Sequence, residues 1–455
     1  MIVRSLDAWQ LHSASTDWNS VPTVATVDVL VVGAGAAGVA AATVAAEAGA
    51  AVLIVERYGF AGGAAVAGMS GTICGLFLAS EEVAAPQQIV NGFTGRFIAE
   101  LERRNGITGP QRYGRTFTRA HDPLVWREAA DAFLRQSGAT VLFHSQVVDV
   151  LKEAEAYIGV VVATDAGMGI VRASRVVDAS GDGAVAARGG ELYHFGQDGR
   201  VQNPTMFFRL GDVDTDEFWK AWGGDTICPS WISAAIDDAR LTGAELPRNK
   251  IWVFGTTRPR ELLVNATRLI GEDGRELNMI NPVDFTEAEY LGRRQVRAYY
   301  DFFRELVPGC SSSYVVDTGV QVGVRQTRTI AGIATLTNQD VVEARKTDAS
   351  ICRSPWPIEL HSGQRPRLHW ILDDYYDVPY GTLVPATGEH IIVAGRCLSA
   401  EHEALASARV TAQCFEYGHA AGVATLISLD SGVSYRRVDA SAVRNAMIFN
   451  GSDLG

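Results

Sequence analysis

Residues 27–56 read VDVLVVGAGAAGVAAATVAAEAGAAVLIVE, and this stretch decides the fold. An apolar, mostly β-branched run is followed by the glycine pattern GxGxxG, an alanine-rich stretch and a second apolar run that ends in an acid. The pattern predicts a strand at 27–32, a helix from about 36 to 48 and a strand at 51–55. Two strands joined by a helix within about 30 residues form a βαβ unit, whose strands run parallel.

The glycines and the acid of this unit have the spacing of a dinucleotide-binding motif. Gly33 permits a tight turn, Gly35 leaves room for a pyrophosphate beside the backbone, and Gly38 lets helix and strand pack closely. The start of the helix faces the phosphate charge. Glu56, which ends the second strand, is placed to accept hydrogen bonds from a ribose 2′-hydroxyl. The stretch therefore predicts a bound dinucleotide.

The same stretch has one alternative interpretation, a membrane span, because residues 29–46 carry no charge. Three glycines and many alanines make a poor contact with lipid, and no belt of Trp and Tyr or cluster of Lys and Arg flanks the segment. The sequence therefore favours a chain with no stable membrane insertion.

The composition is that of a folded, acidic protein. Of 455 residues, 47% are hydrophobic and 20% are charged, which argues against a disordered or collagen-like chain. The length favours two structural units, or one core with a large insertion. The formal net charge of −12 argues against binding to nucleic acid, which needs a basic surface.

The cysteines and the N-terminal residues bear on metals and location. Six cysteines form no CxxC pair and no metal-type spacing, so we expect no metal site and reduced thiols in a cytoplasmic protein. The first residues, MIVRSLDAWQLHSASTDW, lack the apolar core of a secretory signal.

Several further segments resemble one known family. They are RYGFAGGAA (57–65), RVVDASGDG (175–183), VGVRQTR (322–328), PYGTLVP (379–385), HIIVAGR (390–396) and VAGRCLSAEHEA (393–404). With the glycine motif, they resemble the FAD-dependent oxidoreductase family of the glutathione-reductase-like (two-dinucleotide-binding-domain) flavoprotein superfamily. One departure lies at Glu359-Leu360-His361, where the family often has Asp-x-His.

The resemblance implies an α/β fold in which a glutathione-reductase-like, FAD-binding Rossmann-type domain carries an inserted α+β substrate domain. We expect the first half of the FAD-binding domain at 1–190, the inserted substrate domain at 191–371 and the C-terminal half of the FAD-binding domain at 372–455.

The motif and the resemblance together predict the residues that hold FAD. By resemblance, the backbone at Val147 contacts the adenine, and Gly395 and Arg396 lie near the ribityl chain and the isoalloxazine. The full predicted set is Gly33, Gly35, Ala36, Ala37, Gly38, Glu56, Arg57, Gly62, Gly63, Val147, Gly181, Gly395, Arg396 and Arg409.

Periodicity and turn residues predict the remaining elements. They are helices at 124–137, 285–306 and 406–425, strands at 140–143, 147–150, 205–210, 250–256, 262–269 and 314–321, a hairpin of 156–164 with 168–173, and an irregular loop at 353–368. We expect Arg293, Arg294 and Arg297 to form a solvated or salt-bridged helix face.

Four residues are candidates for catalysis, and three of them have a structural alternative. Arg325 suits binding of a substrate carboxylate or polarisation of a carbonyl, or else an ion pair at a domain junction. His361 suits acid or base chemistry near neutral pH, or else a place in a loop or the core. Tyr380 can donate to a substrate oxygen or simply pack. His402 closely follows the 390–396 segment and borders the flavin in the functional interpretation.

We expect an FAD-dependent dehydrogenase or oxidase. No second GxGxxG followed by a helix and an acid is present, so no separate NAD(P)H-binding domain is expected. The enzyme would take a hydride from a small polar or carbonyl-bearing organic substrate and pass electrons to oxygen, a quinone or a protein. The alternatives are a flavin-dependent reductase or monooxygenase, a non-redox enzyme that contains FAD, and a scaffold without cofactor. A homo-oligomer is compatible with each.

Overall fold

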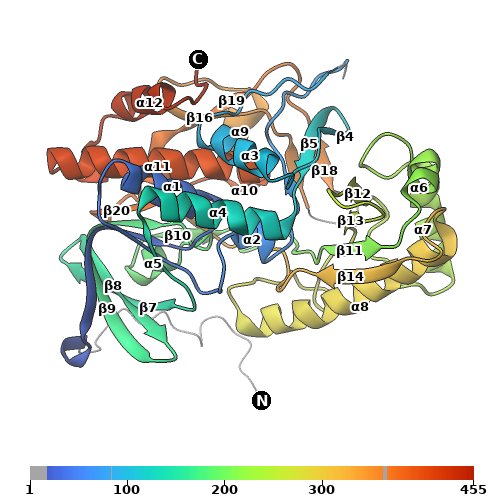
Figure 1. Cartoon of the computed structure of the whole chain (residues 1–455), viewed down its shortest axis with the longest axis horizontal. Coiled ribbons are helices and arrows are strands. Elements are labelled where there is room, and N and C mark those ends of the chain that lie inside the picture. The colour runs from blue at the N-terminus through green and yellow to red at the C-terminus, as the bar shows by residue number, and fades with distance from the viewer. Residues whose placement is uncertain (1–17, 83–84, 362–365) are drawn as a thin grey trace.

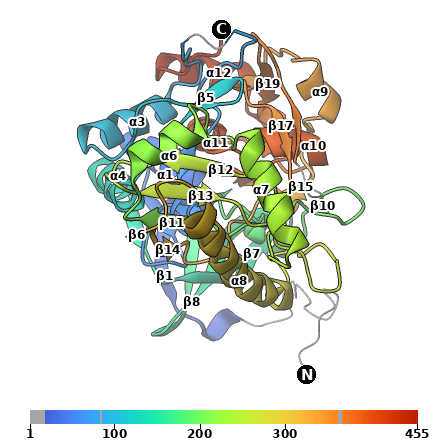
Figure 2. The same cartoon turned by 90° about the vertical axis from the view of Figure 1, so that its right-hand side faces the viewer.

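The computed structural model describes residues 18–82, 85–361 and 366–455, so most of the N-terminal segment read above lies outside the described residues. A layered α/β unit occupies the left and top of Figure 1, and a second unit of strands and helices occupies the right. Figure 2 looks onto the helices of that second unit.

The first unit is built on a seven-stranded sheet in the order β6-β2-β1-β9-β8-β7, with β20 paired to β9. Its strands are β1 (Thr23–Val32), β2 (Val52–Val55), β6 (Thr140–Leu142), β7 (Gln146–Glu153), β8 (Ala156–Thr164), β9 (Gly167–Asp178) and β20 (Ile391–Val393). The pairs β6–β2, β2–β1, β1–β9 and β9–β20 are parallel, whereas β7, β8 and β9 form an antiparallel meander. The predicted βαβ unit and hairpin are confirmed.

Helix α1 (Ala36–Glu47) packs between this sheet and α11 (Thr411–Ser431) with almost no space on either side. A Cβ on Gly38 would lie 1.8 Å from the carbonyl oxygen of Gly33, at the end of β1. On the other side of the helix, a Cβ on Gly418 would lie 2.0 Å from the carbonyl oxygen of Ala37. The absence of a side chain at Gly38 and at Gly418 therefore lets α1 pack closely against both neighbours.

The helix predicted at 124–137 is confirmed as α4 (Pro123–Ser137), which packs against α1. Its N-cap Asp122 accepts hydrogen bonds from the backbone N–H groups of Leu124 and Val125, and Gly138 ends it with φ = 86°. The other described elements around the sheet are α2 (Gly63–Val66), α3 (Phe93–Arg103), α5 (Ala184–Arg188), α9 (Asn338–Val342), α10 (His402–Ala408), α12 (Ala440–Phe449), β3 (Thr72–Ile73), β4 (Gln111–Tyr113), β5 (Thr116–Ala120), β10 (Tyr193–Phe195), β15 (Arg328–Ile330) and the 3-10 turns Trp18–Ser20, Tyr380–Leu383 and Tyr435–Arg437.

The second unit has its own hydrophobic core, drawn from residues 206–322. Four antiparallel strands in the order β12-β13-β11-β14 are covered by three helices. These elements are β11 (Phe208–Gly211), β12 (Trp252–Gly255), β13 (Leu262–Asn265), β14 (Tyr314–Thr318), α6 (Thr215–Trp222), α7 (Ser230–Leu241) and α8 (Pro282–Leu306). The predicted strands and the long helix are confirmed, whereas α6 and α7 had no counterpart in the predictions.

The irregular loop predicted at 353–368 was wrong for 353–354, 358–360 and 367–368, which lie in strands. β16 (Ser350–Ser354) pairs with β19 (Tyr376–Pro379), and β17 (Ile358–Leu360) pairs with β18 (Arg367–His369). Residues 362–365 lie outside the described part of the chain. Ile351 and Ile358 belong to the core around α1 and α11, so the 191–371 segment contributes to both cores.

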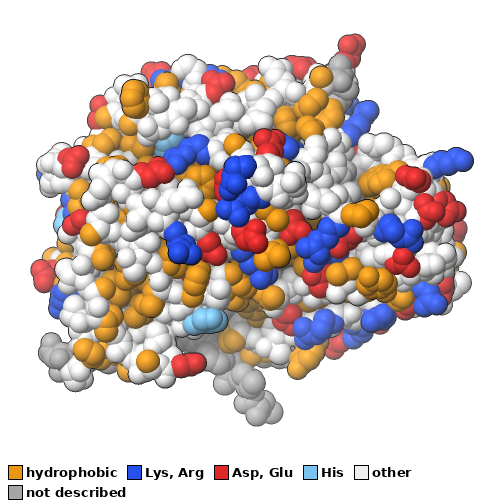
Figure 3. Space-filling view, in the orientation of Figure 1, with side chains coloured by type: hydrophobic (Ala, Val, Ile, Leu, Met, Phe, Trp, Pro, Cys, Tyr) orange, Lys and Arg blue, Asp and Glu red, His pale blue; other side chains and the backbone are white. Residues whose placement is uncertain are grey.

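The basic residues of α8 lie on its solvent-facing surface, as predicted. Arg293 pairs with Glu289, and Arg294 pairs with Glu245 and Glu272. Figure 3 shows acidic and basic side chains interspersed in the region where α8 lies in Figure 1. This surface balances its charges locally and needs no bound anion.

We predict that Gly38→Ala lowers the free energy of unfolding by about 1–3 kcal/mol or more, because its methyl group would overlap the Gly33 carbonyl. The matched control is Gly95→Ala in α3, where an added Cβ meets nothing within 4 Å and helix propensity should raise stability by up to about 1 kcal/mol. Urea denaturation followed by circular dichroism measures both. Equal effects of the two substitutions would contradict the packing argument.

Candidate active site

A long cavity lies where the parallel strands end. The turns that follow β1, β2, β9 and β20 all line it, which places it at the carboxyl edge of the sheet. It has an inner part of about 240 Å³ and an outer part of about 850 Å³. The two parts share Gly33, Glu56, Arg57, Ser180, Asp182, Met279 and Phe285 as lining residues. Met279 and Phe285 come from the second unit, so both units enclose the cavity.

The glycine turn and the start of α1 form one wall. Ala36 and Ala37 line the cavity, and their backbone N–H groups belong to the first helical turn, which has no partner within its own helix. The N-cap residue is Gly35, which has no side chain that could cap the helix. A Cβ on Gly35 would have Gly63 Cα at 3.8 Å as its nearest neighbour, which is ordinary contact, so the chain itself leaves this position open.

Glu56 directly follows β2 and lines both parts of the cavity. One carboxylate oxygen accepts from the Ala34 N–H at 2.7 Å, and the other accepts from the Tyr58 N–H at 2.9 Å. These bonds fix the carboxylate but use only part of its acceptor capacity. Glu56 can therefore accept further hydrogen bonds from a ligand hydroxyl.

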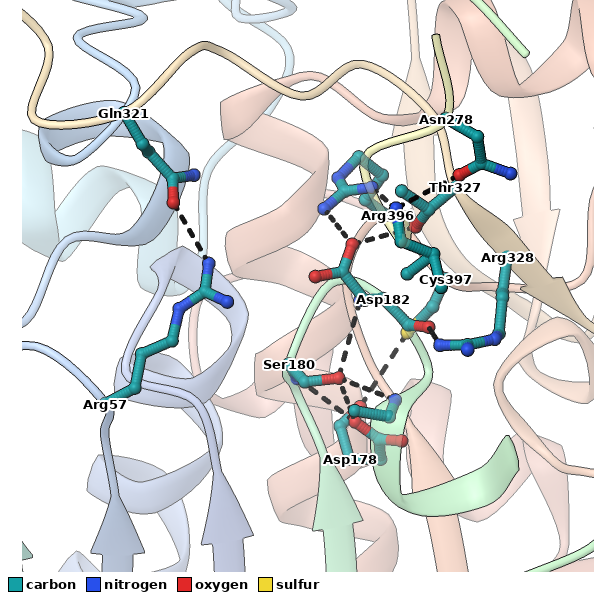
Figure 4. Close-up of polar contacts among 12 residues, drawn as sticks. Arg57, Asp178, Ser180, Asp182, Asn278, Gln321, Thr327, Arg328, Arg396 and Cys397 are labelled. Carbon is teal, nitrogen blue, oxygen red and sulfur yellow. Dashed lines mark hydrogen bonds and ion pairs between the residues drawn. The ribbon is translucent and has the colours of Figure 1, made fainter. Parts of the chain in front are cut away.

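The turn after β9 is organised by a carboxylate that is fully buried. Asp178 accepts from the backbone N–H and hydroxyl of Ser180 through one oxygen, and from the N–H groups of Val185 and Ala186 through the other. Figure 4 shows this cluster beneath Asp182. Because all four donors lie within eight residues of it, Asp178 fixes the shape of the turn that lines the cavity.

Asp182 links this turn to the segment after β20 (Figure 4). Arg396 donates to Asp182 Oδ1 at 2.7 Å, and the Thr327 hydroxyl donates to the same oxygen at 2.8 Å. Burial alone would raise the pKa of Asp182, but the Arg396 guanidinium outweighs it, and the pKa lies below its ordinary value. The carboxylate is therefore ionised and pairs with Arg396 at neutral pH.

A break between two helices brings Arg409 to the cavity. The predicted single helix at 406–425 is two helices, α10 ending at Ala408 and α11 starting at Thr411. Arg409 and Val410 form the break, and both line the cavity together with Thr411. Helix α11 has no side-chain N-cap, so its positive end is exposed to whatever fills the inner part.

The inner end holds a buried polar cluster. Glu359 accepts from the Tyr113 hydroxyl at 2.6 Å and lies 3.3 Å from Nε2 of His361. Arg325 lies in the same wall, where its guanidinium donates to the Asn203 carbonyl at 2.7 Å. The side chain of Glu359 is only 8% exposed and that of His361 only 3%, so the cluster is nearly closed to bulk water.

His361 is neutral at physiological pH. Burial and the charge of Arg325 lower its pKa well below the ordinary 6.5. The Glu359 carboxylate only accepts, so Nε2 carries the hydrogen, and the lone pair is left on Nδ1. That Nδ1 is buried and has no hydrogen-bond partner in the described part of the chain. At neutral pH the ring therefore keeps a lone pair on Nδ1.

A third arginine lies behind this wall. Arg248 is fully buried, and its guanidinium carbon lies 5.7 Å from the centre of the Trp252 ring. The Trp252 ring lies 5.9 Å from that of His361. Sequence reasoning missed Arg248, Tyr113 and Trp252, since no motif surrounds them. A sequence signal was present for Glu359, which belongs to the Glu359-Leu360-His361 segment where the chain departs from the family pattern, and for Asp182, which belongs to the family-like segment 175–183.

Most of the residues predicted to hold FAD line the inner part of the cavity: Gly33, Gly35, Ala36, Ala37, Glu56, Arg57, Gly62, Gly63, Gly181, Gly395, Arg396 and Arg409. Val147 lines the outer part. Gly38 packs against Gly33 instead. The structure thus brings these positions together, and their contacts with FAD stay a prediction.

Of the predicted catalytic residues, Arg325 and His361 line the cavity and the other two do not. Tyr380 is buried in the core around α1, where its hydroxyl donates to the Tyr435 carbonyl at 3.0 Å. His402 begins α10 beside the turn that contains Gly196. Packing therefore accounts for Tyr380, as its structural alternative expected.

The cavity fits a dinucleotide. It combines an open glycine turn, helix N–H groups without partners in their own helix, an acid with spare acceptor capacity, and two adjoining parts of about 240 Å³ and 850 Å³. The family described as FAD dependent oxidoreductase matches residues 28–447. The chain belongs to that family. It is an FAD-dependent redox enzyme, and FAD is its cofactor.

This flavoprotein is also similar to a thiamine thiazole synthase of Aeropyrum pernix, with 36% identity over 172 residues, which cover 35% of the chain and 57% of that protein. The match thus spans little more than half of the relative. Among solved structures, p-nitrophenol 4-monooxygenase PnpA of Pseudomonas putida DLL-E4 matches with a TM-score of 0.50 at 13% identity, covering 94% of this chain and 86% of that one. A geranylgeranyl bacteriochlorophyll reductase-like protein of Thermoplasma acidophilum matches with a TM-score of 0.47 at 15% identity, covering 94% and 82%.

The likeness to the monooxygenase shows a shared mixed α/β fold with a Rossmann-like parallel sheet. Within the described ranges, no helix has the length and apolar character needed to cross a membrane. Over those same ranges, no group of three or more His, Cys, Asp and Glu side chains is arranged to hold a metal ion.

We predict that Gly35→Val releases FAD from a protein that still folds. The position is open within the chain, so the added side chain would occupy ligand space rather than collide with the fold. Absorbance of the desalted protein reports bound flavin, and circular dichroism reports the fold. A folded variant that keeps stoichiometric flavin would refute the assignment of the pyrophosphate to this turn.

Proposed function

We propose that this flavoprotein is a dehydrogenase or oxidase that removes a hydride from a small polar or carbonyl-bearing organic substrate. The observation that carries the proposal is the neutral His361 at the inner end of the cavity, with a buried Nδ1 that lacks a partner among the described residues. FAD supplies a two-electron acceptor when bound. Oxygen, a quinone or a protein then takes the electrons.

The residues of the cavity divide into those that bind FAD and those that handle substrate. In this proposal, the N–H groups of Ala36 and Ala37 bind the pyrophosphate and Glu56 binds a ribose. Val147 contacts the adenine, and the positive end of α11 lies near the isoalloxazine. The lining residues support this assignment, because Val147 lines only the outer part, Glu56 lines both parts, and Ala36, Ala37 and Thr411 line only the inner part.

At the inner end, His361 acts as the general base. A substrate that loses a hydride from carbon also loses a proton from the attached hydroxyl or amine and becomes a carbonyl or an imine. Nδ1 of His361 accepts that proton, and Glu359 holds the ring through Nε2. Arg325 binds or polarises the substrate oxygen. The nearly closed cluster keeps water away from these groups.

We also propose a glutathione-reductase-like arrangement, in which 1–190 and 372–455 bind FAD and the inserted 191–371 segment supplies the substrate end. The parallel pairing of β20 with β9 supports the union of the two FAD-binding halves. The second core within 206–322 supports the insertion. All six cysteines are free, which supports a reducing, cytoplasmic location. A homo-oligomer stays a prediction.

The reaction class is tested by anaerobic mixing with a panel of small alcohols, amines and hydroxy acids. A dehydrogenase or oxidase loses its oxidised flavin absorbance with substrate alone. We predict that His361→Gln keeps FAD and slows this reduction by about 10²- to 10⁴-fold, because the base is lost. Reduction only by an external reductant, followed by oxygen-dependent hydroxylation, would support the monooxygenase alternative and refute the proposal.

The rate of flavin reduction should also respond to pH through His361. Protonation of the base abolishes the reaction, and since the pKa is depressed, the rate should stay flat as pH falls through 6.5 and drop only below it. Besides burial, Arg325 depresses this pKa, so Arg325→Met should move the acid limb to higher pH. Arg294→Met, on the exposed face of α8, is the control. An acid limb that Arg325→Met leaves in place would contradict His361 as its source.

A further inference from the structure

The inner end of the cavity has an excess of buried positive charge. Arg325 and Arg409 line it, and Arg248 lies behind it against Trp252. Arg325 is 6% exposed and Arg248 is not exposed at all. The carboxylate of Glu359 acts electrostatically on all three guanidinium groups.

Glu359 does not neutralise these arginines by direct contact, because its carboxylate is bonded to other side chains. Its Oε1 accepts from the Tyr113 hydroxyl and lies next to the His361 ring. Arg325 donates instead to the Asn203 carbonyl, and Arg409 donates to the Gln202 side-chain oxygen. Neutral oxygens therefore receive the hydrogen bonds that ionised arginines usually give to carboxylates.

Arg248 is the most unusual member of the group. Nε and both terminal nitrogens of its guanidinium are buried and have no hydrogen-bond partner over the described ranges. Its backbone is held by the Tyr299 hydroxyl, which leaves the side chain fixed beside Trp252. A buried, unpaired guanidinium destabilises a fold, and proteins retain such groups where a ligand charge compensates.

We propose that the inner end binds the carboxylate of a small organic acid, with Arg325 in direct contact and Arg248 selecting for the negative charge. The inference deepens the proposed function, on which it rests, by naming the substrate class. The inner part has only about 240 Å³, which must also admit part of the flavin, so the acid is small. The planar guanidinium fork matches a carboxylate, and the enclosing aromatic rings Tyr113, Phe207 and Phe254 exclude water.

Malonate tests the inference, with malonamide as its neutral counterpart of the same shape. Both are added to the FAD-loaded enzyme at constant ionic strength, and binding is followed by the flavin absorbance difference and by the melting temperature. Malonate should bind saturably and raise the melting temperature, whereas malonamide should bind at least about tenfold more weakly, because it lacks the charge.

Arg248→Met and Arg325→Met should each weaken malonate binding at least about tenfold, and Arg294→Met on α8 should leave it unchanged. Without malonate, Arg248→Met should melt no lower than the parent enzyme, because it removes an unpaired buried charge. A merely structural Arg248 would instead lower the melting temperature and leave malonate affinity intact. If that variant does not fold, Arg325→Met and the comparison of malonate with malonamide decide.

Equal binding of malonate and malonamide, or unchanged malonate affinity in both arginine variants, would overturn the inference. Its failure is distinguishable from that of the proposed function. Flavin reduced by neutral alcohols or amines without malonate binding would leave the hydride reaction standing and remove only the substrate class. Malonate binding without any reducing substrate in the panel would leave the anion site standing and remove the dehydrogenase.

Discussion

The structure depends on how closely α1 approaches its neighbours on both sides. Below the helix, Gly38 faces the Gly33 carbonyl, and above it Gly418 faces the Ala37 carbonyl, each at a distance that no side chain could occupy. The first contact sets α1 directly over the end of β1, so the first-turn N–H groups are aimed at the turn where the cavity begins. The contact at Gly418 packs α11 closely against α1. The positive N-terminal end of α11 then lies at the inner part of the cavity.

As a result of this packing, the charges that line the cavity differ from one part to the other. The first-turn N–H groups of α1 stand in the inner part and the fixed carboxylate of Glu56 lines both parts, where we propose that phosphates and ribose hydroxyls bind. In the Asp182–Arg396 pair the two charges cancel. The inner end keeps positive charge beside one neutral histidine. Both units contribute to this cavity, because the turns of the large sheet line it together with Met279 and Phe285 of the second unit.

The cofactor end could be predicted from the sequence because its determinants are local. Gly33, Gly35, Gly38 and Glu56 act within one βαβ unit, and their spacing alone specifies the turn, the helix and the acid. The break at Arg409 could not be predicted, because no glycine or proline marks it. At the break, the Ala408 carbonyl accepts from the Tyr417 hydroxyl, and the Ala412 N–H donates to the carbonyl of Cys74, which is far away in the sequence. Strand β16 was missed for a related reason, since its partner β19 begins only at Tyr376. Arg248 gave no signal, because its environment is assembled from segments that are far apart in the sequence.

Residues of both units line the cavity, and this affects how much folded protein a cell retains. A ligand that spans Gly33 and Phe285 ties the two cores together, so opening either one costs contacts with the ligand. Its stabilisation grows with the logarithm of free ligand concentration. Chains made faster than FAD becomes available hold their two cores together less firmly, and proteases reach the transiently opened form more often. The amount of this enzyme in a cell should therefore follow the amount of flavin, without any dedicated regulator.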